Sequence, residues 1–210
     1  MKNKLIVFLR APRPGRVKTR LAQVIGKKPA LEAYRVLVNH LLENLSSLQD
    51  VELRFTPDNA HAELAPWLRP GWRARPQGKG DLGERLARAF QKSFAEGSQR
   101  VVIIGSDCPE VSARDIEAAW RSLRLNDVVL GPASDGGYWL IGLKGPGPGL
   151  FRNVPWSTAA VLETTIARAR AAGLRCHCLR KLTDIDTAKD WEEFNKVTRQ
   201  NALRKRRKPQ

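Results

Sequence analysis

The sequence predicts an α/β protein in which helices flank a mixed, mostly parallel sheet. Apolar runs of strand length alternate with segments of helical periodicity along the chain. One of these runs, residues 101–104, consists of four β-branched residues and is typical of a strand buried on both faces. With 210 residues, of which 42% are hydrophobic and 28% charged, the chain is long enough for one domain and too short for two full domains.

The first half of the chain contains three predicted strands and two predicted helices. Apolar residues recur at intervals of three and four from Leu31 to Leu45, which predicts an amphipathic helix. Residues 81–84, Asp-Leu-Gly-Glu, have the pattern of a capping box and predict a second helix, whose apolar side continues to Phe94. Residues 73–76 are a poor strand candidate because a proline interrupts them. The three strands are the short apolar runs at residues 5–9, 51–55 and 101–104.

The second half of the chain contains three more predicted helices. Residues 112–115, Ser-Ala-Arg-Asp, predict a capped helix start. A helix over residues 158–172 is expected to close at Gly173, because glycine readily adopts the left-handed conformation at a helix end. Thr187 caps a last helix. The remaining apolar runs predict strands at residues 127–130, 138–143 and 174–179.

The charge of the chain favours anionic partners. The formal net charge is +16, from 37 Lys and Arg against 21 Asp and Glu. Five basic residues lie at 204–208, and the other 32 against 21 acidic residues still leave +11. Nucleotides and phosphorylated metabolites suit this balance. Nucleic acid is possible but not favoured, because no helix-turn-helix or aromatic-studded strand is recognised. We expect a nucleotide-binding domain over residues 1–200 and a basic, disordered tail over residues 201–210.

The N-terminal residues and the cysteines predict a cytoplasmic protein without a membrane partner. The sequence has no run of about 18 apolar residues. Only the five apolar residues 5–9 precede Arg10, which is fewer than a signal peptide requires. The three cysteines are an odd number without the spacing of a disulfide framework, which agrees with a reducing compartment.

Asp107 follows the central strand directly, in the sequence Gly-Ser-Asp-Cys-Pro of residues 105–109. Open α/β sheets bind their ligands at the carboxyl ends of the strands. A carboxylate there can hold Mg²⁺ or Mn²⁺ against the phosphates of a substrate. The alternative interpretation is an aspartate that only caps a helix or stabilises a turn.

A basic loop lies between the first strand and the helix that follows. Five cations occupy the eleven positions from Arg10 to Arg20. Two prolines stiffen the loop, and Gly15 permits close approach of a ligand to the backbone. The loop is therefore a candidate phosphate-binding element, although a solvated basic loop is the alternative. The candidate contacts are Arg10, Pro14, Gly15, Lys18, Thr19 and Arg20.

Residues 78–83 match the dinucleotide fingerprint G-x-G-x-x-G, but a lone match is weak evidence. The strand before it is poor, so we reject a Rossmann assignment. A tight loop at a helix N-terminus remains a plausible phosphate contact, which makes Gly80 and Asp81 further candidates.

Two more acidic groups follow later in the chain. Asp135 lies in a glycine-rich turn between two predicted strands, and such a turn is often purely structural. Asp184 and Asp186 alternate along an extended segment before the last helix. They could share a divalent ion, or one of them could cap the helix.

Six motifs in order along the chain carry a family resemblance. They are residues 11–21 (Ala-Pro-x-Pro-Gly-x-x-Lys-Thr-Arg-Leu), 80–85 (Gly-Asp-Leu-Gly-x-Arg), 105–109, 131–138 (Gly-Pro-Ala-x-Asp-Gly-Gly-Tyr), 156–158 (Trp-Ser-Thr) and 184–187 (Asp-Ile-Asp-Thr). Together they resemble a bacterial family of uncharacterised proteins with the glycosyltransferase-A (GT-A) fold, similar to nucleotide-diphospho-sugar transferases. Its wider relatives are the molybdenum-cofactor nucleotidyltransferases and 2-phospholactate guanylyltransferase. The resemblance covers residues 4–194.

The resemblance implies a GT-A fold and a catalytic site built around Lys18 and Asp107. Lys18 and Arg20 would contact the phosphates of a nucleotide donor, and Asp107 would bind Mg²⁺ or Mn²⁺ with support from Asp135 and Asp186. The implied reaction is nucleotidyl transfer from a nucleoside triphosphate to a small phosphorylated or hydroxyl acceptor, with release of pyrophosphate. A glycosyltransferase with a nucleotide-sugar donor and a basic nucleic-acid-binding module without catalysis are the alternatives. The substrate side of the site would comprise Asp135, Gly136, Gly137 and Tyr138.

Overall fold

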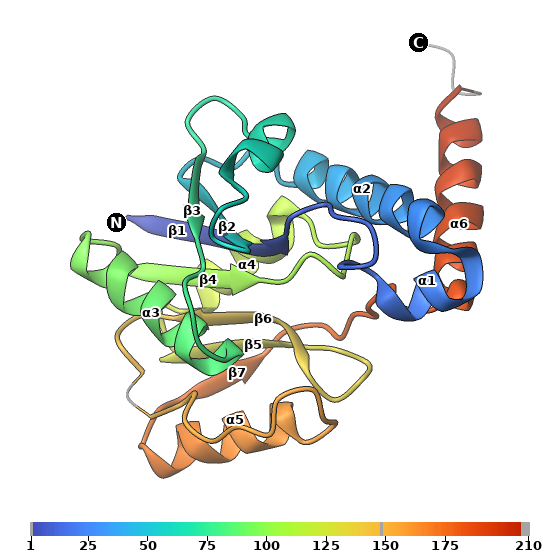
Figure 1. The fold of residues 1–210 in the computed structure, drawn as a ribbon. Helices are drawn as coiled ribbons and strands as arrows, with labels where there is room; N and C mark the ends of the chain where they lie inside the picture. Colours follow the sequence, from blue (N-terminus) through green and yellow to red (C-terminus); the bar gives the residue numbers. More distant parts are fainter. Residues whose placement is uncertain (1, 148, 207–210) are drawn as a thin grey trace.

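Seven strands form one sheet across the middle of the protein, in the order β3-β2-β1-β4-β6-β5-β7 (Figure 1). The computed structural model describes residues 2–147 and 149–206. Neighbouring strands are parallel, except that β6 is antiparallel to both β4 and β5. This confirms a mixed, mostly parallel sheet in a single α/β domain. The strands are β1 (Asn3–Arg10), β2 (Val51–Thr56), β3 (Arg73–Pro76), β4 (Arg100–Ile104), β5 (Val128–Pro132), β6 (Tyr138–Leu143) and β7 (Cys176–Cys178).

Helices cover both faces of the sheet. Apolar residues of α2 and α4 pack with one set of strand residues, and those of α3 and α5 pack with the other. None of the helices in the described part of the chain is long and apolar enough to cross a membrane. The helices are α1 (Thr19–Ile25), α2 (Lys27–Asn44), α3 (Leu82–Ala95), α4 (Ala113–Ser122), α5 (Val161–Ala171), α6 (Ala188–Arg206) and a 3₁₀ helix, η1 (His61–Trp67).

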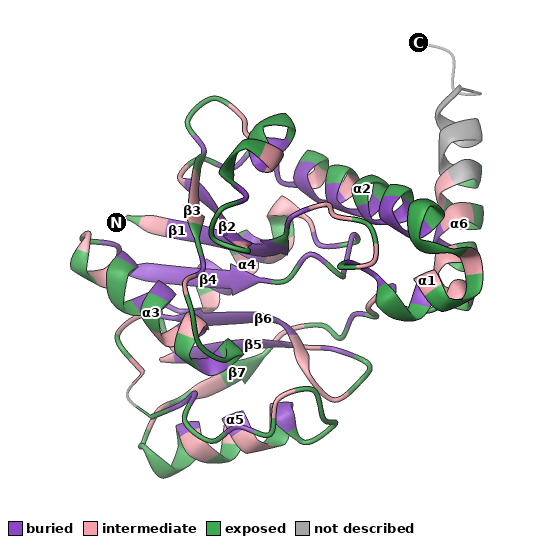
Figure 2. Cartoon of the chain, in the orientation of Figure 1, coloured by how far each residue is buried: buried purple, intermediate pink, exposed green. Residues whose placement is uncertain are grey.

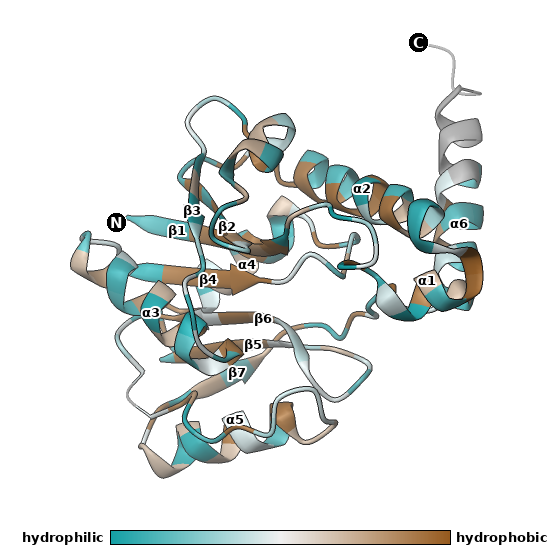
Figure 3. Ribbon diagram, in the orientation of Figure 1, coloured by the Kyte–Doolittle hydropathy of each residue, from teal (hydrophilic) through white to brown (hydrophobic). Residues whose placement is uncertain are grey.

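The central strand β4 is buried on both faces, as its sequence predicts. Val102 and Ile104 pack on the side of α2 and α4, whereas Val101 and Ile103 pack on the side of α3 and α5. Figure 2 shows β4 buried along its length, and Figure 3 shows most of this strand as hydrophobic. This alternation explains the unbroken β-branched run, because a strand covered on both sides has no polar face.

The predicted capping boxes of α3 and α4 are both present. The carboxylate of Asp81 accepts a hydrogen bond from the Glu84 backbone N–H at 2.8 Å, and Glu84 accepts one from the Asp81 N–H at 2.9 Å. Asp115 accepts from the Ser112 N–H at 2.9 Å. Each box satisfies backbone donors that would otherwise have no partner inside the helix, so these helix starts were predictable from local sequence.

Helix α1 differs from the prediction, which placed all of residues 10–21 in a loop. The structure begins a helix at Thr19. A helix of seven residues is marginal alone, and this one is held by Leu21, which is fully buried against Ala30 and Ala33. Tertiary packing therefore stabilises an element that propensity alone does not show.

The last helix, α6, ends at Arg206 and so includes residues 201–206 of the expected tail. The expected disorder of this tail stays a prediction. Extending an existing helix adds one hydrogen bond per residue, and Ala, Leu, Arg and Lys, which make up all of residues 202–206, are good helix formers. The expectation for residues 207–210 lies outside the described residues.

A charged network is buried within the sheet, near the N-terminal end of β1. Lys4 Nζ lies 3.0 Å from Glu52 Oε2, and Arg54 Nε lies 2.6 Å from Glu52 Oε1. The Glu52 side chain is 0% exposed, and those of Lys4 and Arg54 are 2% exposed. Burial raises the pKa of Glu52, but the attraction of Arg54 and Lys4 outweighs it, so the pKa lies below its ordinary value. Such a network is costly to break, because each remaining charge stays in a region of low dielectric.

We expect Glu52→Gln to lower the free energy of unfolding by about 3–5 kcal/mol, because it leaves the buried Arg54 without its carboxylate and Lys4 with only the partly exposed Glu96 at 3.2 Å. Urea denaturation followed by circular dichroism measures the change. The control is Glu32→Gln, which removes an exposed ion pair with Arg35 at 2.9 Å and should cost less than about 1 kcal/mol. Equal losses in the two variants would contradict a stabilising role for the buried network.

Candidate functional site

Four loops meet at the carboxyl edge of the sheet. The strands β1, β4, β5 and β7 run in the same direction, so the segments that follow them emerge on the same side. In Figure 1 the loops after β1 and β4 lie on the right, beside α1 and α2. Each loop supplies charged residues of the predicted site: Lys18 after β1, Asp107 after β4, Asp135 after β5, and Asp184 and Asp186 after β7.

Lys18 binds two of these carboxylates at once. Its Nζ donates to Asp107 Oδ1 and, at 3.0 Å, to Asp186 Oδ1. The Lys18 side chain is 2% exposed, whereas those of Asp107 and Asp186 are 51% and 44% exposed. Burial lowers the pKa of Lys18, but attraction to Asp107 and Asp186 outweighs it and raises the pKa above its ordinary value. The ammonium therefore stays charged behind two carboxylates that face solvent.

The backbone around Lys18 is unusual. Lys18 has φ 45° and ψ 50°, in the left-handed region, and it occupies the N-cap position of α1. Non-glycine residues adopt this conformation rarely. The Lys18 side chain is buried against the carboxylates, while the next residues, Thr19 and Arg20, are exposed.

Backbone hydrogen bonds bring the last acidic segment to the site. The Ile185 N–H donates to the Asp107 carbonyl at 2.9 Å, and the Leu182 N–H donates to the Pro132 carbonyl at 3.0 Å. The hydroxyls of Ser134 and Thr183 lie 2.9 Å apart. These bonds join three loops into one framework, which places residues far apart in sequence within contact of one another.

Asp184 belongs to the same cluster, and the sequence analysis gave it only as a carboxylate that could share a divalent ion with Asp186 or cap the last helix. The Cys108 thiol donates to Asp184 Oδ1 at 2.7 Å. Burial, together with the negative charges of Asp107, Asp135 and Asp186, raises the pKa of Asp184 to about 6. The alternation of Asp184 with Asp186 was the signal available in the sequence.

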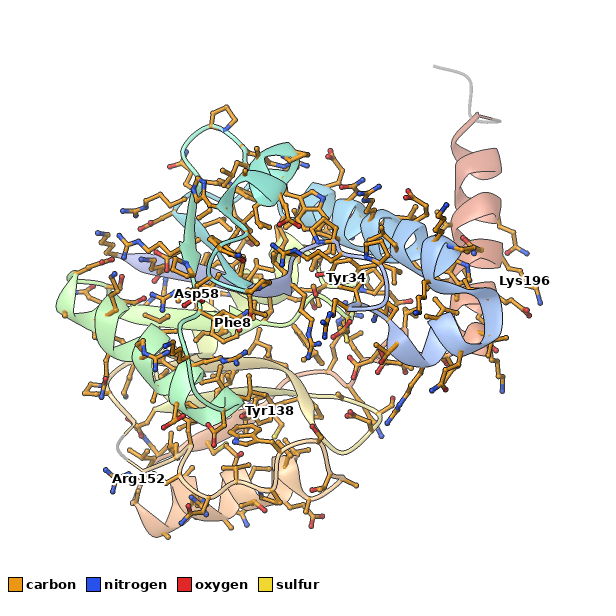
Figure 4. All side chains as sticks on the ribbon, in the orientation of Figure 1. Phe8, Tyr34, Asp58, Tyr138, Arg152 and Lys196 are labelled. Atoms are coloured by element: carbon orange, nitrogen blue, oxygen red, sulfur yellow. The ribbon has the colours of Figure 1, made fainter. Side chains whose placement is uncertain are left out.

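Tyr34 is a second residue of this edge that sequence reasoning missed, since it was counted only among the apolar positions of its helix. Its hydroxyl donates to the Arg10 carbonyl at 2.9 Å and accepts from the Arg10 N–H at 3.0 Å. Burial raises its pKa to about 12. Figure 4 shows Tyr34 by α2 and the end of β1. It anchors the start of the basic loop to α2, and its phenol group was the available signal, because a buried hydroxyl needs a partner.

The five cations of the basic loop have different environments. Arg13 binds Glu63 at 2.5 Å and Asn59 at 3.3 Å, so its charge is already balanced. Lys18 is buried with its carboxylates. The other three are exposed and have no carboxylate partner within the part of the chain that the structure describes: Arg10, Arg16 and Arg20. The loop therefore presents unbalanced positive charge beside the Asp107 carboxylate.

Of the other predicted loop residues, Pro14 is exposed and Gly15 has φ +71°. Lys27 of α2 packs over Gly15, where an added Cβ would lie 3.3 Å from its Cδ. The loop is thus held in a conformation that favours glycine at this position.

Gly80 and Asp81 lie at the start of α3. Asp81 caps α3 and lines a cavity of about 700 Å³ with Gly83, Phe151 and Arg152, a cavity to which neither Lys18 nor Asp107 contributes. The local geometry assigns Asp81 a structural role, and its predicted phosphate contact remains a prediction.

The turn at Asp135 is also built by local bonds. Asp135 Oδ1 accepts from the Gly137 N–H at 2.8 Å. Gly136 has φ +87°, and a Cβ there would lie 2.3 Å from the Ala159 carbonyl oxygen, so only glycine fits. Tyr138 packs with the core on the side of α3 and α5, and burial raises its pKa. Asp135 and Asp184 are near enough to interact electrostatically, whereas Tyr138 serves the core.

The residues suit a divalent cation that shares its coordination with a substrate. Within residues 2–147 and 149–206, no three His, Cys, Asp or Glu side chains form a ready metal cage. Mg²⁺ commonly uses only one or two carboxylates and completes its shell with phosphates and water. Asp107 and Asp186 supply such oxygens, they face solvent, and they already bind one cation, the Lys18 ammonium, together.

The raised pKa of Asp184 predicts a pH-dependent stability effect. Its uncharged form is favoured in the folded protein, so its stabilising contribution is complete below the ordinary value of 3.8 and is lost as pH rises through about 6. The melting temperature of Asp184→Asn minus that of the wild type should therefore increase by several degrees as pH rises from 4 to 7. Differential scanning fluorimetry measures this difference. Asp190→Asn is the control: burial raises the pKa of Asp190, but hydrogen bonds from Thr187 and from the Asp186 N–H outweigh it, so the pKa lies below its ordinary value and outside this window. A pH-independent difference for Asp184→Asn would contradict the prediction.

Comparison with known proteins places this geometry in a family. No curated protein matches the chain significantly in sequence. A candidate nucleotide-diphospho-sugar transferase from Desulfovibrio desulfuricans G20 is 35% identical, with a TM-score of 0.81 over 89% of this chain and 84% of that one. A candidate glucose-1-phosphate thymidylyltransferase from Bacillus anthracis, in complex with sucrose, is 13% identical, with a TM-score of 0.60 over 94% and 95% of the two chains.

A third structure shares the fold alone. CMP:2-keto-3-deoxy-manno-octonic acid synthetase, in complex with CTP, is 14% identical, with a TM-score of 0.56 over 96% of this chain and all of that one. These matches confirm the predicted nucleotide-diphospho-sugar transferase fold. Residues 42–158 match the family described as "Uncharacterized protein conserved in bacteria (DUF2064)". The chain belongs to this DUF2064 family.

Proposed function

We propose that the protein is a transferase that acts on a nucleotide donor with the help of Mg²⁺ or Mn²⁺. The observation that carries the proposal is the shared contact of Lys18 with Asp107 and Asp186 at the carboxyl edge of the sheet, flanked by three exposed arginines. Carboxylates beside unbalanced cations suit a ligand that brings both a metal ion and several negative charges. The 35% identical relative described as a candidate nucleotide-diphospho-sugar transferase supports the same substrate class.

The reaction that we favour is nucleotidyl transfer. An oxygen of a phosphorylated or hydroxyl acceptor attacks the α-phosphorus of a nucleoside triphosphate, and pyrophosphate leaves. Asp107 and Asp186 would hold the divalent cation, which when bound neutralises charge on the donor phosphates. Arg10, Arg20 and Lys18 bind and orient those phosphates. Phosphoryl chemistry of this kind depends on positioning and charge stabilisation, so a site without a nucleophilic side chain is sufficient.

Glycosyl transfer is the second candidate, and the description of the 35% identical relative favours it. The same carboxylates and cations would then hold a nucleotide-sugar, and the bond to the sugar would break instead. The two reactions release different products, because nucleotidyl transfer yields pyrophosphate and glycosyl transfer yields a nucleoside diphosphate. Product analysis therefore separates them.

A thermal-shift screen identifies the donor class. The four nucleoside triphosphates and common nucleotide-sugars are each tested with Mg²⁺, with Mn²⁺ and with a chelator. A donor that binds the folded state raises the melting temperature through mass action. We expect at least one metal-dependent shift. If no donor gives one, and RNA binds with a steep salt dependence, the protein is a nucleic-acid-binding module and the proposal fails.

Once the donor is known, Asp107→Asn should lower the turnover number on the order of 10²-fold or more, because it removes a charge that acts in the transition state. Steady-state kinetics with the identified donor measures the change. Glu110→Gln is the matched control: it removes one exposed negative charge three residues away and should leave turnover within about twofold. Unchanged turnover in Asp107→Asn would exclude this carboxylate from the reaction.

Two arginines of the same loop test the phosphate site. Arg20 is exposed and has no carboxylate partner within the described residues, whereas Arg13 is bound to Glu63. We expect Arg20→Ala to weaken donor binding by about tenfold, as one lost charged hydrogen bond implies, and Arg13→Ala to change it little. Isothermal titration calorimetry measures both. Equal effects would indicate a diffuse dependence on net charge instead of a defined contact.

A further inference from the structure

We propose that Lys18 is a built-in counter-ion that makes divalent-cation binding depend on the donor. In the free protein its ammonium holds Asp107 and Asp186 together and so competes with a metal ion for their oxygens. The inference rests on the proposed function, since it concerns the same carboxylates. Lys18 would then compete with the metal ion in the free protein, in addition to contacting phosphate when the donor binds.

The first argument is the position of the ammonium. Lys18 Nζ contacts one oxygen of Asp107 and one of Asp186, which is the pair of groups best placed to share a cation. The Lys18 side chain approaches from the protein interior and is 2% exposed, while both carboxylates are about half exposed. An ion that arrives from solvent therefore meets two carboxylates whose charge is already partly balanced.

The second argument is electrostatic. The Lys18 ammonium donates to a carboxylate oxygen of Asp107 and to one of Asp186. A divalent ion bound to the same oxygens would lie within a few ångströms of this ammonium, and like charges repel strongly where water is largely excluded. Metal binding alone must therefore displace the ammonium, which has no other acidic partner among the described residues.

The third argument is that the phosphates of a donor give the Lys18 ammonium an alternative partner to the two carboxylates. Phosphate oxygens carry several negative charges and accept hydrogen bonds from an ammonium group. The exposed Arg16 and Arg20 flank Lys18 in the chain and would draw those phosphates to it. With a donor in place, the ammonium can bind phosphate and leave Asp107 to the ion. Each ligand then increases the affinity for the other, by the same factor.

The experiment measures Mn²⁺ binding by electron paramagnetic resonance, without any nucleotide. We expect Lys18→Met to bind Mn²⁺ at least tenfold more tightly than the wild type, because the competing charge is gone. Lys18→Arg keeps the charge and should bind no more tightly than the wild type. Lys196→Met, which removes an exposed charge on α6 (Figure 4), is the control and should match the wild type.

A second readout uses inorganic tripolyphosphate in place of the unidentified donor. Calorimetry compares its affinity with and without Mn²⁺ for the wild type and for Lys18→Met. We expect Mn²⁺ to strengthen tripolyphosphate binding to the wild type and to do so much less in Lys18→Met. A folded Lys18→Met variant that binds Mn²⁺ no more tightly than the wild type would overturn the inference.

A measurement on the wild type covers the case in which Lys18→Met does not fold. Amine acylation followed by peptide mass spectrometry reports the accessibility of Lys18. Saturating Mn²⁺ without a donor should make Lys18 several-fold more reactive, because the displaced ammonium loses both carboxylates, and unchanged reactivity would refute displacement. These results are separate from the donor screen: a screen without a hit removes the proposed function, whereas Mn²⁺ results that contradict competition remove only this inference.

Discussion

The structure depends on a balance of charge at one edge of the sheet, where the Lys18 ammonium is shared by Asp107 and Asp186. Without it, the carboxylates of Asp107, Asp135, Asp184 and Asp186 would repel one another across converging loops. Burial is the main reason that the pKa of Asp184 is raised to about 6, and the negative charges of Asp107, Asp135 and Asp186 add to it. This combination of carboxylates and exposed arginines is the basis of the proposal that the ligand is a metal-bound polyphosphate.

The two lysine-centred clusters of the protein illustrate how burial separates scaffold from site. Lys4 and Glu52 are both enclosed within the sheet, where the Glu52 carboxylate lies between the cations of Lys4 and Arg54. Lys18 is equally buried, but its carboxylate partners are about half exposed. The first cluster has no oxygen available to a ligand. The second presents its oxygens to solvent, and this difference makes it the candidate site.

The position of Asp107 was predictable because it depends on local pattern. A β-branched run predicts a buried strand, and an acid directly after it must lie at the carboxyl edge. The capping boxes of α3 and α4 were predictable for the same reason, since each involves residues three apart. Helix α1 was not, because its seven residues rely on the burial of Leu21 against α2, and the extension of α6 to Arg206 was not expected either.

The sequence by itself determined the α/β class, the central strand and the set of charged motifs, because the periodicity of strands and helices depends on residues that are close in the sequence. Only the tertiary structure decided how those motifs pair. Lys18 meets residues 89 and 168 positions away, Arg13 is bound by Glu63, and Asp184 accepts from Cys108. Such partners follow from the order and direction of strands in the sheet, and no local pattern encodes which of five cations will be buried and which will face solvent.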